Sequence, residues 1–249
     1  MTPILTVSFA FVAFELDDDG CLLFSCFFVV KGTIPSEIAL LKQLSWLALA
    51  ANQLSGMLPT ELGLLSQLTL LSLYQNSLAG ELPTELGHLS LLNLLSLRDN
   101  TFVGAIPSEL GLLTNLTVAL TLKNNQFTST IPTELGMLTN SVALELKENR
   151  LTGTIPTELG QLTRMGGLTF NNNSLSGTVP YELSSLWQSL YTLRFEGNAL
   201  LSGTIPAGLC SLNGTCVSTP ISSCDKGNGL FFDCTRLLCG CNCSCRDGI

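Results

Sequence analysis

The residue types that most often perform catalysis are scarce in this sequence. His88 is the single histidine, so any histidine-dependent nucleophile would have to use it. Equivalent positions of the repeat described below hold leucine, methionine, glutamine or serine, which indicates a surface position without a catalytic partner. The motifs GxxxxGK[ST], HExxH and GxSxG and the kinase signatures are absent from the sequence. We therefore expect no catalytic residues, no enzyme activity and no cofactor.

Cysteine is concentrated at the carboxyl end, which finishes in CGCNCSC. Eight of the ten cysteines lie there: Cys210, Cys216, Cys224, Cys234, Cys239, Cys241, Cys243 and Cys245. This density is typical of disulfide bonding in an oxidising compartment, and the spacing does not reveal the pairing. Zinc binding by the last four cysteines is the alternative, because alternate residues of an extended strand share one face and four thiolates suit zinc. The C-x-C-x-C-x-C spacing is not the usual C-x-x-C, so we predict a disulfide-bonded cap and no metal.

Composition narrows the classes of function. Lys and Arg number 11 against 19 Asp and Glu, and the formal net charge of -8 would repel a nucleic acid. The hydrophobic content of 46% is ample for a core. The two most apolar runs, MTPILTVSFAFVAF and CLLFSCFFVV, are separated by acidic residues and fall short of the roughly 20 residues of a membrane-spanning helix. We expect neither nucleic-acid binding nor a transmembrane span in this chain.

The sequence repeats with a period of about 24 residues. Tetrapeptides such as GTIP and GELP mark the repeats, which start at Gly32, Gly56, Gly80, Gly104, Ser129, Gly153, Gly177 and Gly203. Eight of the ten prolines occupy one position of the repeat, where a fixed φ angle favours a turn. A structural module that needs neighbours on both sides is copied in this way, whereas a catalytic site rarely is.

Within one repeat the spacing of apolar residues changes. Leu68, Leu71 and Leu73 approach Asn76 as LxxLxLxxN, which predicts a short strand, and the segment TELGLL predicts a brief helical turn. Successive strands would stack about 4.8 Å apart, and each coil would bury its leucines against the coils beside it. The pattern predicts a solenoid.

The full motif LxxLxLxxNxLxGxIPxxLGxL occurs in QLTLLSLYQNSLAGELPTELGHL, from Gln67 to Leu89. It resembles the plant-type leucine-rich repeat, and the resemblance extends from Gly32 to about Leu209. The resemblance implies an α/β solenoid, a right-handed superhelix with a concave parallel β-sheet and short helical or 3-10 turns on the convex side. Similar repeats form the ectodomains of plant receptor-like kinases, secreted inhibitors of cell-wall-degrading enzymes and surface proteins of microalgae.

The expected organisation has three parts: an apolar amino-terminal segment (1–31), the repeats (32–209) and the cysteine-rich cap or tail (210–249). FVAFELDDD, from Phe11 to Asp19, fits LxxLxLxxN with Asp19 at the asparagine position, so we expect one degenerate repeat there. CLLFSCFFVV is then an apolar insertion. The paired-cysteine cap that the resemblance leads us to expect at this end is absent, and a signal peptide or a truncated start remain the alternatives.

Two polar residues recur in nearly every repeat. The first is an asparagine, whose amide can pair with backbone groups left free at the turn: Asn52, Asn76, Asn100, Asn125, Asn149, Asn173 and Asn198. The second is a glutamate: Glu37, Glu61, Glu85, Glu109, Glu134, Glu158 and Glu182. The glutamates lie at the start of the predicted helical turn, where the local dipole favours a carboxylate. The alternative is an outer row of carboxylates that binds divalent cations or basic wall polymers.

Residues that flank the strand leucines should point outward from the concave sheet. These positions vary between repeats while the leucines, prolines and asparagines do not, as expected of a ligand surface on a constant frame. The candidate ligand-binding residues are Trp46, Tyr74, Arg98, Asp99, Lys123, Glu145, Lys147, Glu148 and Asn171. Arg98, Lys123 and Lys147 form a basic run edged by acids, with aromatic residues at the amino-terminal end.

Glycosylation sequons occur at Asn115, Asn172, Asn213 and Asn242. Together with the cysteines they favour an extracellular or cell-surface recognition module that binds a protein, peptide or glycan on the concave sheet, with a co-receptor as a further partner. Two alternatives remain. The chain is a structural or adhesive wall or matrix component that uses its glutamate row, or it is the repeat domain of a larger receptor-like kinase.

Overall fold

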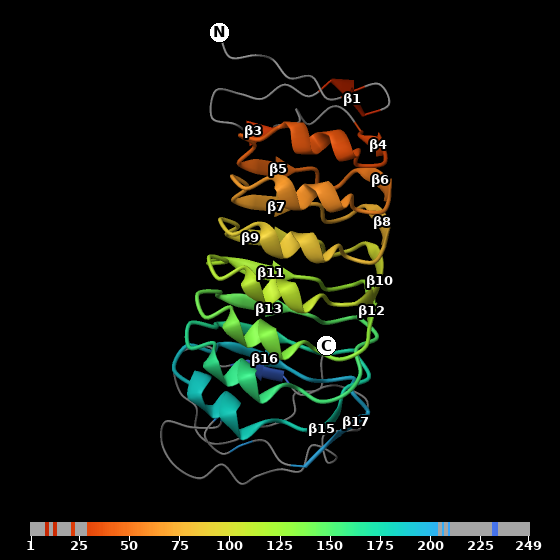
Figure 1. Cartoon of the computed structure of the whole chain (residues 1–249). Helices are drawn as coiled ribbons and strands as arrows, with labels where there is room; N and C mark the ends of the chain where they lie inside the picture. Colours follow the sequence, from red (N-terminus) through yellow and green to blue (C-terminus); the bar gives the residue numbers. More distant parts are fainter. Residues whose placement is uncertain are drawn as a thin grey trace.

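The computed structural model describes residues 29–203, together with Pro206 and Leu209, and the backbone of four short strands outside that range. These strands are β1 (Ser8–Phe9), β2 (Val12–Ala13), β3 (Cys21–Leu22) and β18 (Phe231–Asp233). The repeats stack as successive coils of a leucine-rich-repeat solenoid (Figure 1). The predicted tail cysteines, Cys210 to Cys245, and the sequons at Asn213 and Asn242 lie outside the described residues. In the described part, no helix has the length and apolar character needed to cross a membrane.

One strand from each coil forms a nine-stranded sheet, called here the concave sheet, in the order β18-β16-β14-β13-β11-β9-β7-β5-β3. Its central strands are β5 (Trp46–Ala48), β7 (Leu70–Ser72), β9 (Leu94–Ser96), β11 (Ala119–Thr121), β13 (Ala143–Glu145), β14 (Gly167–Thr169) and β16 (Thr192–Arg194). Pairing is parallel from β3 to β16, and β18 adds antiparallel to β16. The predicted parallel sheet is confirmed.

A second sheet runs along another side of the coils and was not predicted. Five of its strands lie in the order β12-β10-β8-β6-β4. They are β4 (Lys31–Gly32), β6 (Gln53–Gly56), β8 (Ser77–Gly80), β10 (Thr101–Ala105) and β12 (Gln126–Thr128). A bridge between Thr130 and Thr152 and the parallel pair β15 (Ser176–Thr178) and β17 (Leu200–Ser202) continue the same side toward the carboxyl end. We refer to all of these as the second sheet.

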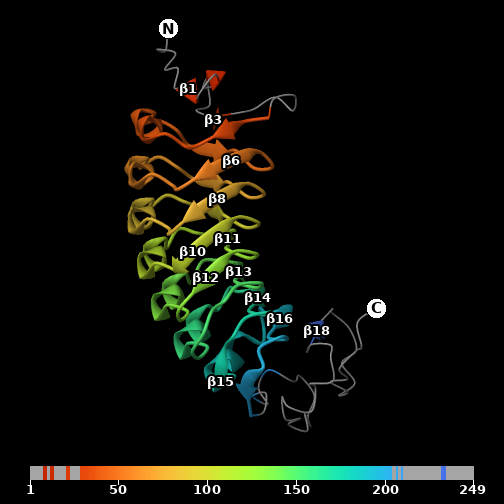
Figure 2. The ribbon, with the colours of Figure 1, turned by 90° about the vertical axis from the view of Figure 1, so that its right-hand side faces the viewer.

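The segment predicted as a helical turn forms a short 3-10 helix in each coil. These helices are η1 (Ser36–Leu40), η2 (Thr60–Leu64), η3 (Thr84–His88), η4 (Ser108–Leu112), η5 (Thr133–Met137), η6 (Thr157–Gln161) and η7 (Tyr181–Leu186). Each follows a proline, whose fixed φ suits the residue before a helix. The 3-10 helices lie opposite the concave sheet, on the outer side of the curved stack (Figure 2).

The core lies between the sheets and the 3-10 helices. Leucines at the same position of successive repeats, such as Leu71 and Leu95, are opposite one another in the concave sheet and fully buried. Phe102 and Phe127 fill a wider part of the core with ring centroids 6.3 Å apart. Since each coil buries its apolar face only against its neighbours, the core is one continuous column.

The recurring asparagines connect neighbouring coils. Asn125 Nδ2 donates to Leu122 O in its own coil at 3.0 Å and to Leu97 O in the preceding coil at 3.1 Å. Asn125 Oδ1 accepts a hydrogen bond from Phe102 N at 3.1 Å. These buried bonds satisfy backbone groups at the turn that follows each concave strand.

The amino-terminal strand that pairs with the solenoid lies outside the segment that matches LxxLxLxxN. The first strand of the concave sheet is β3 (Cys21–Leu22), where Cys21 lies opposite Trp46. β2 (Val12–Ala13), which lies inside the segment from Phe11 to Asp19, instead pairs antiparallel with β1. Cys21 precedes Trp46 by 25 positions, which is about one repeat length.

Candidate functional site

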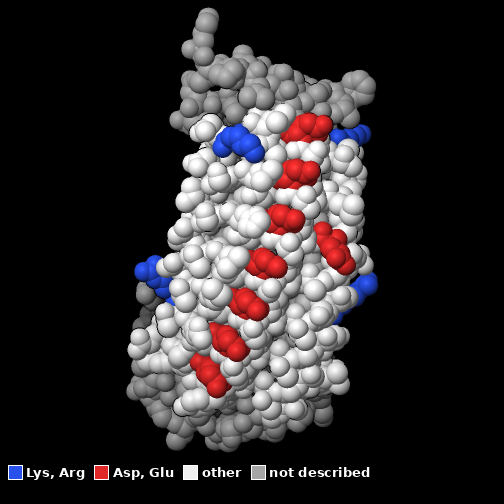
Figure 3. Space-filling view, in the orientation of Figure 1, with Lys and Arg blue, Asp and Glu red and all other residues white. Residues whose placement is uncertain are grey.

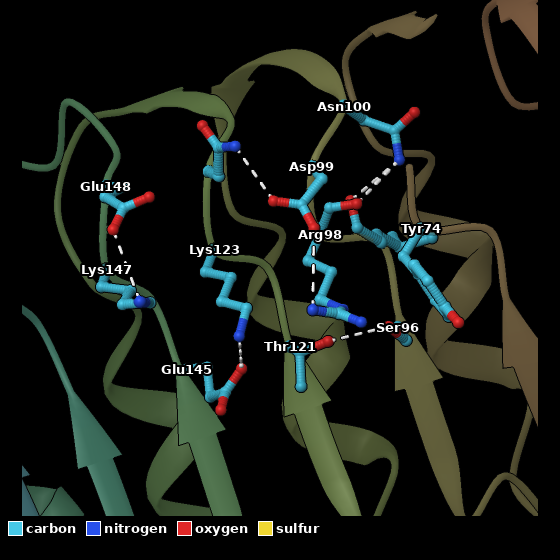
Figure 4. A network of polar contacts seen from close by, with 12 residues as sticks. Tyr74, Ser96, Arg98, Asp99, Asn100, Thr121, Lys123, Glu145, Lys147 and Glu148 are labelled. Atoms are coloured by element: carbon cyan, nitrogen blue, oxygen red, sulfur yellow. Dashed lines mark hydrogen bonds and ion pairs between the residues drawn. The ribbon is translucent and has the colours of Figure 1, made fainter. Parts of the chain in front are cut away.

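The middle of the concave sheet carries a network of fixed polar side chains (Figure 4). The guanidinium carbon of Arg98 lies 4.3 Å from the centre of the Tyr74 ring, a cation–π contact. Arg98 also pairs with Asp99 at 3.7 Å, and Asp99 Oδ1 accepts a hydrogen bond from Asn124 Nδ2 at 3.0 Å. Three successive coils therefore contribute to one arrangement.

Each of the two lysines predicted to extend the basic run has its own carboxylate. Lys123 Nζ lies 3.0 Å from Glu145 Oε2, and Lys147 Nζ lies 3.4 Å from Glu148 Oε1. The run of positive charge is therefore a row of ion pairs. The side chains of Arg98, Lys123 and Lys147 are only 20 to 32% exposed. A ligand would meet alternating charges held in place and not a uniform basic strip.

Deeper in the concave sheet, hydroxyl groups form a neighbouring row. Thr121 Oγ1 donates to Ser96 Oγ at 3.0 Å across β11 and β9, and both residues are buried. Ser72 extends the row on the amino-terminal side, whereas Glu145 separates Thr121 from Thr169 on the other side.

The carboxyl-terminal end of the concave sheet differs because three of its buried polar atoms lack a hydrogen-bond partner. Within the described residues, Thr169 Oγ1, Asn171 Oδ1 and Glu196 Oε2 are buried without a hydrogen bond. Burial raises the pKa of the Glu196 carboxyl, and the nearby Arg194 and Lys147 partly offset this effect. Of the sequence-predicted ligand residues, Asn171 belongs to this end, whereas Tyr74, Arg98, Asp99, Lys123, Glu145, Lys147 and Glu148 belong to the network in the middle.

Trp46 belongs to a further concave column that sequence reasoning did not list. Register places one residue per coil at the start of each concave strand: Trp46, Leu70, Leu94, Ala119, Ala143, Gly167 and Thr192. Trp46 is half exposed. The column changes from large apolar residues to small ones along the solenoid, so the apolar part of the concave sheet lies at its amino-terminal end. In the sequence, this column is found two positions before the outward-facing column of Ala48, Ser72 and Ser96.

Asp99 and Glu148 occupy a column with a special backbone conformation. They and the equivalent Gln75, Asn124 and Asn172 have φ angles between 53° and 58°, in the left-handed region. The sequon residue Asn172 is therefore exposed in a turn beside the concave sheet. The sequon residue Asn115 is also exposed and donates to Ser90 O at 2.8 Å.

The glutamate row lies on the 3-10 helices and forms a line of separate acidic patches across the convex face (Figure 3). Several of these carboxylates accept from the hydroxyl of the preceding residue, as in Thr84 to Glu85 at 3.4 Å. No group of three or more His, Cys, Asp or Glu residues within the described part of the chain is arranged to hold a metal ion.

The second sheet presents a regular set of hydroxyl side chains in its carboxyl-terminal coils. We call this set the hydroxyl array, and it consists of Thr128, Thr130, Thr152, Thr154, Ser176, Thr178 and Ser202. All are exposed except Ser176, which is partly exposed. Sequence reasoning missed the array, although its signal was the recurrence of TST, TGT and SGT before Ile-Pro or Val-Pro.

Comparisons with known proteins agree with this architecture. Residues 67–89 match the family model described as Leucine Rich Repeat. No curated protein sequence matches the chain significantly. Among solved structures, the chain is 35% identical to the plant peptide hormone receptor RGFR1 in complex with RGF2, with a TM-score of 0.70 over 76% of this chain and 30% of that chain.

Two further solved structures are similar. The Arabidopsis receptor kinase HAESA, in complex with the peptide hormone IDA and the co-receptor SERK1, is 34% identical, with a TM-score of 0.64 over 67% of this chain and 28% of that chain. A plant ice-binding protein is 27% identical, with a TM-score of 0.52 over 71% of both chains. The chain thus spans less than a third of the two receptor chains. The repeat motif, the parallel concave sheet with its 3-10 turns and these similarities together show that the chain is a plant-type leucine-rich-repeat protein.

Proposed function

We propose that the chain is an extracellular or cell-surface recognition module that binds a peptide or protein through the concave sheet. Similarity to peptide hormone receptors in complex with their ligands supports this proposal. The concave positions vary in size and charge along the solenoid, while the buried leucines and asparagines repeat. A surface of this kind discriminates between ligands by shape and charge pattern.

The observation that carries the proposal is the network around Arg98. Tyr74 and Asp99 hold the guanidinium from two sides, so little side-chain freedom remains to be lost when a ligand arrives. Aromatic and arginine side chains of this kind dominate the binding energy of many interfaces. The proposed ligand site extends from Trp46 to Asn171 and includes the ion pairs of Lys123 and Lys147.

The location is a separate part of the proposal. Secretion from a eukaryotic cell should yield chains with no free thiols that lose mass on treatment with a glycosidase, because the tail cysteines would be paired and the sequons used. Analysis of the culture medium on a non-reducing gel, with thiol labelling, measures both. Retention inside the cell with free thiols would overturn the extracellular location.

A library of displayed random peptides, selected on the immobilised chain, tests binding. We expect selected peptides to lose at least about tenfold in affinity for the variant R98Q/K123Q/K147Q. Its control, E109Q/E134Q/E158Q, removes three charges from the convex face and should bind as wild type does. Melting temperatures of all three proteins show whether each is folded. Equal affinity for the folded concave variant, or a selection that enriches no peptide, would refute the concave site.

A second candidate function is binding to ice, and a different surface favours it. The chain is similar to a plant ice-binding protein over 71% of both chains. The hydroxyl array offers uncharged, evenly placed side chains on a sheet, unlike the mixed charges of the concave sheet. The test measures the fraction of the protein that is incorporated into slowly grown ice. The comparison protein is a leucine-rich-repeat protein that is known to bind a peptide. Exclusion of the wild-type chain from ice to the same degree as the comparison protein would refute this function.

A further inference from the structure

We propose that the hydroxyl array is the site through which the chain binds an ordered layer of water at an ice surface. The inference rests on the second candidate function and assigns that function to particular side chains. Equivalent members of the array in successive coils are one strand spacing, about 4.8 Å, apart. Within each coil the two hydroxyl residues flank Ser129, Gly153 or Gly177, whose φ angles of 68°, 74° and 80° are alike. The second direction of the array is therefore a repeated turn geometry and not an extended strand.

One half of the array is held by hydrogen bonds to the preceding coil. Thr152 Oγ1 donates to Ser129 O, Ser176 Oγ to Gly153 O, and Ser202 Oγ to Gly177 O, each at 3.2 Å. A hydroxyl that donates inward keeps its acceptor lone pairs free for water outside. Three coils therefore present the same acceptor in the same orientation.

The other half is held by packing of methyl groups over glycines. A Cβ on Gly153 would lie 2.7 Å from Thr130 Cγ2, and one on Gly177 would lie 2.9 Å from Thr154 Cγ2. At Gly203 the corresponding distance to Thr178 Cγ2 is 3.0 Å. Each threonine methyl thus occupies the space that the glycine of the next coil leaves open, which fixes its rotamer.

The two halves are joined across strands. Thr130 lies opposite Thr152 in a parallel bridge, and Thr178 lies opposite Ser202 between β15 and β17. Fixed methyl and hydroxyl groups together would order water, because the methyls cannot hydrogen-bond and the hydroxyls set the positions of the first water layer. A rigid array loses little conformational entropy when it binds a solid surface.

The array ends on its amino-terminal side because the equivalent positions of the preceding coils hold residues without a hydroxyl group. In the column of Thr130, Thr154 and Thr178, the three coils before Thr130 hold Met57, Glu81 and Ala105, which separate the array from Thr33 in the first coil. In the column of Thr128 and Thr152, the preceding coil holds Val103. Met57, Glu81, Val103 and Ala105 occupy equivalent positions of the repeat without a hydroxyl, so the chain contains its own matched control.

The experiment compares ice incorporation of four proteins: wild type, T152K/T154K, V103K/A105K and T154V. The first double variant places two charges in the centre of the array, and the second places the same charges at equivalent positions outside it. T154V keeps the shape of the side chain and the methyl packing over Gly177, so it tests the hydroxyl in a variant that is expected to fold. Circular dichroism and melting temperature establish folding.

We expect wild type and V103K/A105K to enter ice equally, T152K/T154K to lose at least about tenfold, and T154V to lose about twofold to fivefold. If wild type and both double variants enter ice equally, the chain binds ice through another surface and the assignment to the hydroxyl array is wrong. If V103K/A105K loses as much as T152K/T154K, added charge alone explains the result, which also overturns the assignment. If wild type is excluded from ice, both the second candidate function and this inference are wrong.

Discussion

The two sheets of the solenoid share one frame but present opposite kinds of surface. The concave sheet changes from coil to coil, with Tyr74, Arg98 and Lys123 at equivalent positions. The second sheet repeats nearly the same pair of hydroxyl residues over its carboxyl-terminal coils. A surface that varies suits a ligand of irregular shape, such as a peptide, whereas a surface that repeats suits a ligand that repeats. The comparison shows that one leucine-rich frame can present a variable surface on one side and a repeating surface on another.

A change to the shared frame should damage both sheets together. Asn125→Ala removes the partner of Phe102 N and the donors to Leu97 O and Leu122 O, so we expect a loss of about 3 kcal/mol of unfolding free energy. Urea denaturation measures it. The neighbouring exposed Asn124→Gly, at a φ of 53°, should change stability by less than about 0.5 kcal/mol. Equal effects of the two substitutions would show that the asparagine bonds do not hold the coils together.

Substitution of one glycine should affect the second sheet and leave the concave sheet unchanged. Gly153 has a φ of 74°, so Gly153→Ala should cost about 1 to 2 kcal/mol and displace the Thr130 methyl. Gly104→Ala imposes the same strain at a φ of 78°, but its Cβ would meet the flexible Glu81 side chain outside the hydroxyl array. We expect similar melting temperatures for both variants and weaker ice incorporation for Gly153→Ala alone. Peptide binding should be unchanged in both, and its loss in Gly153→Ala would show that the sheets are coupled.

The half-buried Glu196 at the carboxyl-terminal end of the concave sheet should make stability depend on pH. Burial raises the pKa of Glu196 above its ordinary value of 4.5, so the folded chain keeps this proton to a higher pH than the unfolded chain. The stabilising effect is therefore present at low pH and is lost as the pH rises through the folded pKa. Glu196→Gln should gain stability relative to wild type above that pH, by less than about 1 kcal/mol because the group is partly exposed. A stability difference that does not change between pH 4 and pH 7 would contradict the raised pKa.

The smallest expected effect concerns the network in the middle of the concave sheet. A double-mutant cycle of Tyr74→Ala and Arg98→Ala should give a coupling energy of about 0.5 to 1 kcal/mol from the cation–π contact. The measurement is again urea denaturation. A coupling of zero would mean that Arg98 is not held in place in solution, which would weaken the argument for a preorganised site.

The sequence allowed prediction of those features that recur at one phase of the repeat. The leucines predicted the concave strands, and the segment after each proline predicted the 3-10 turns, because identical residues at identical spacing must occupy identical environments. The ion pairs of Lys123 and Lys147 were not predictable, since each lysine reaches a different neighbour: Glu145 two residues before Lys147, and Glu148 one residue after it. Which carboxylate each lysine contacts depends on the rotamers of the side chains involved. The second sheet was missed because its strands pair with residues about 22 positions away rather than with their own repeat equivalents.

Cross-linking with a selected peptide tests the central claim most directly. A peptide from the library, carrying a photoreactive group, would be bound to the wild-type chain and irradiated, and the attached residues would be identified by mass spectrometry. We expect cross-links to concave residues such as Tyr74, Arg98 and Lys123. Cross-links confined to the hydroxyl array or to the 3-10 helices would show that the concave sheet is not the recognition surface.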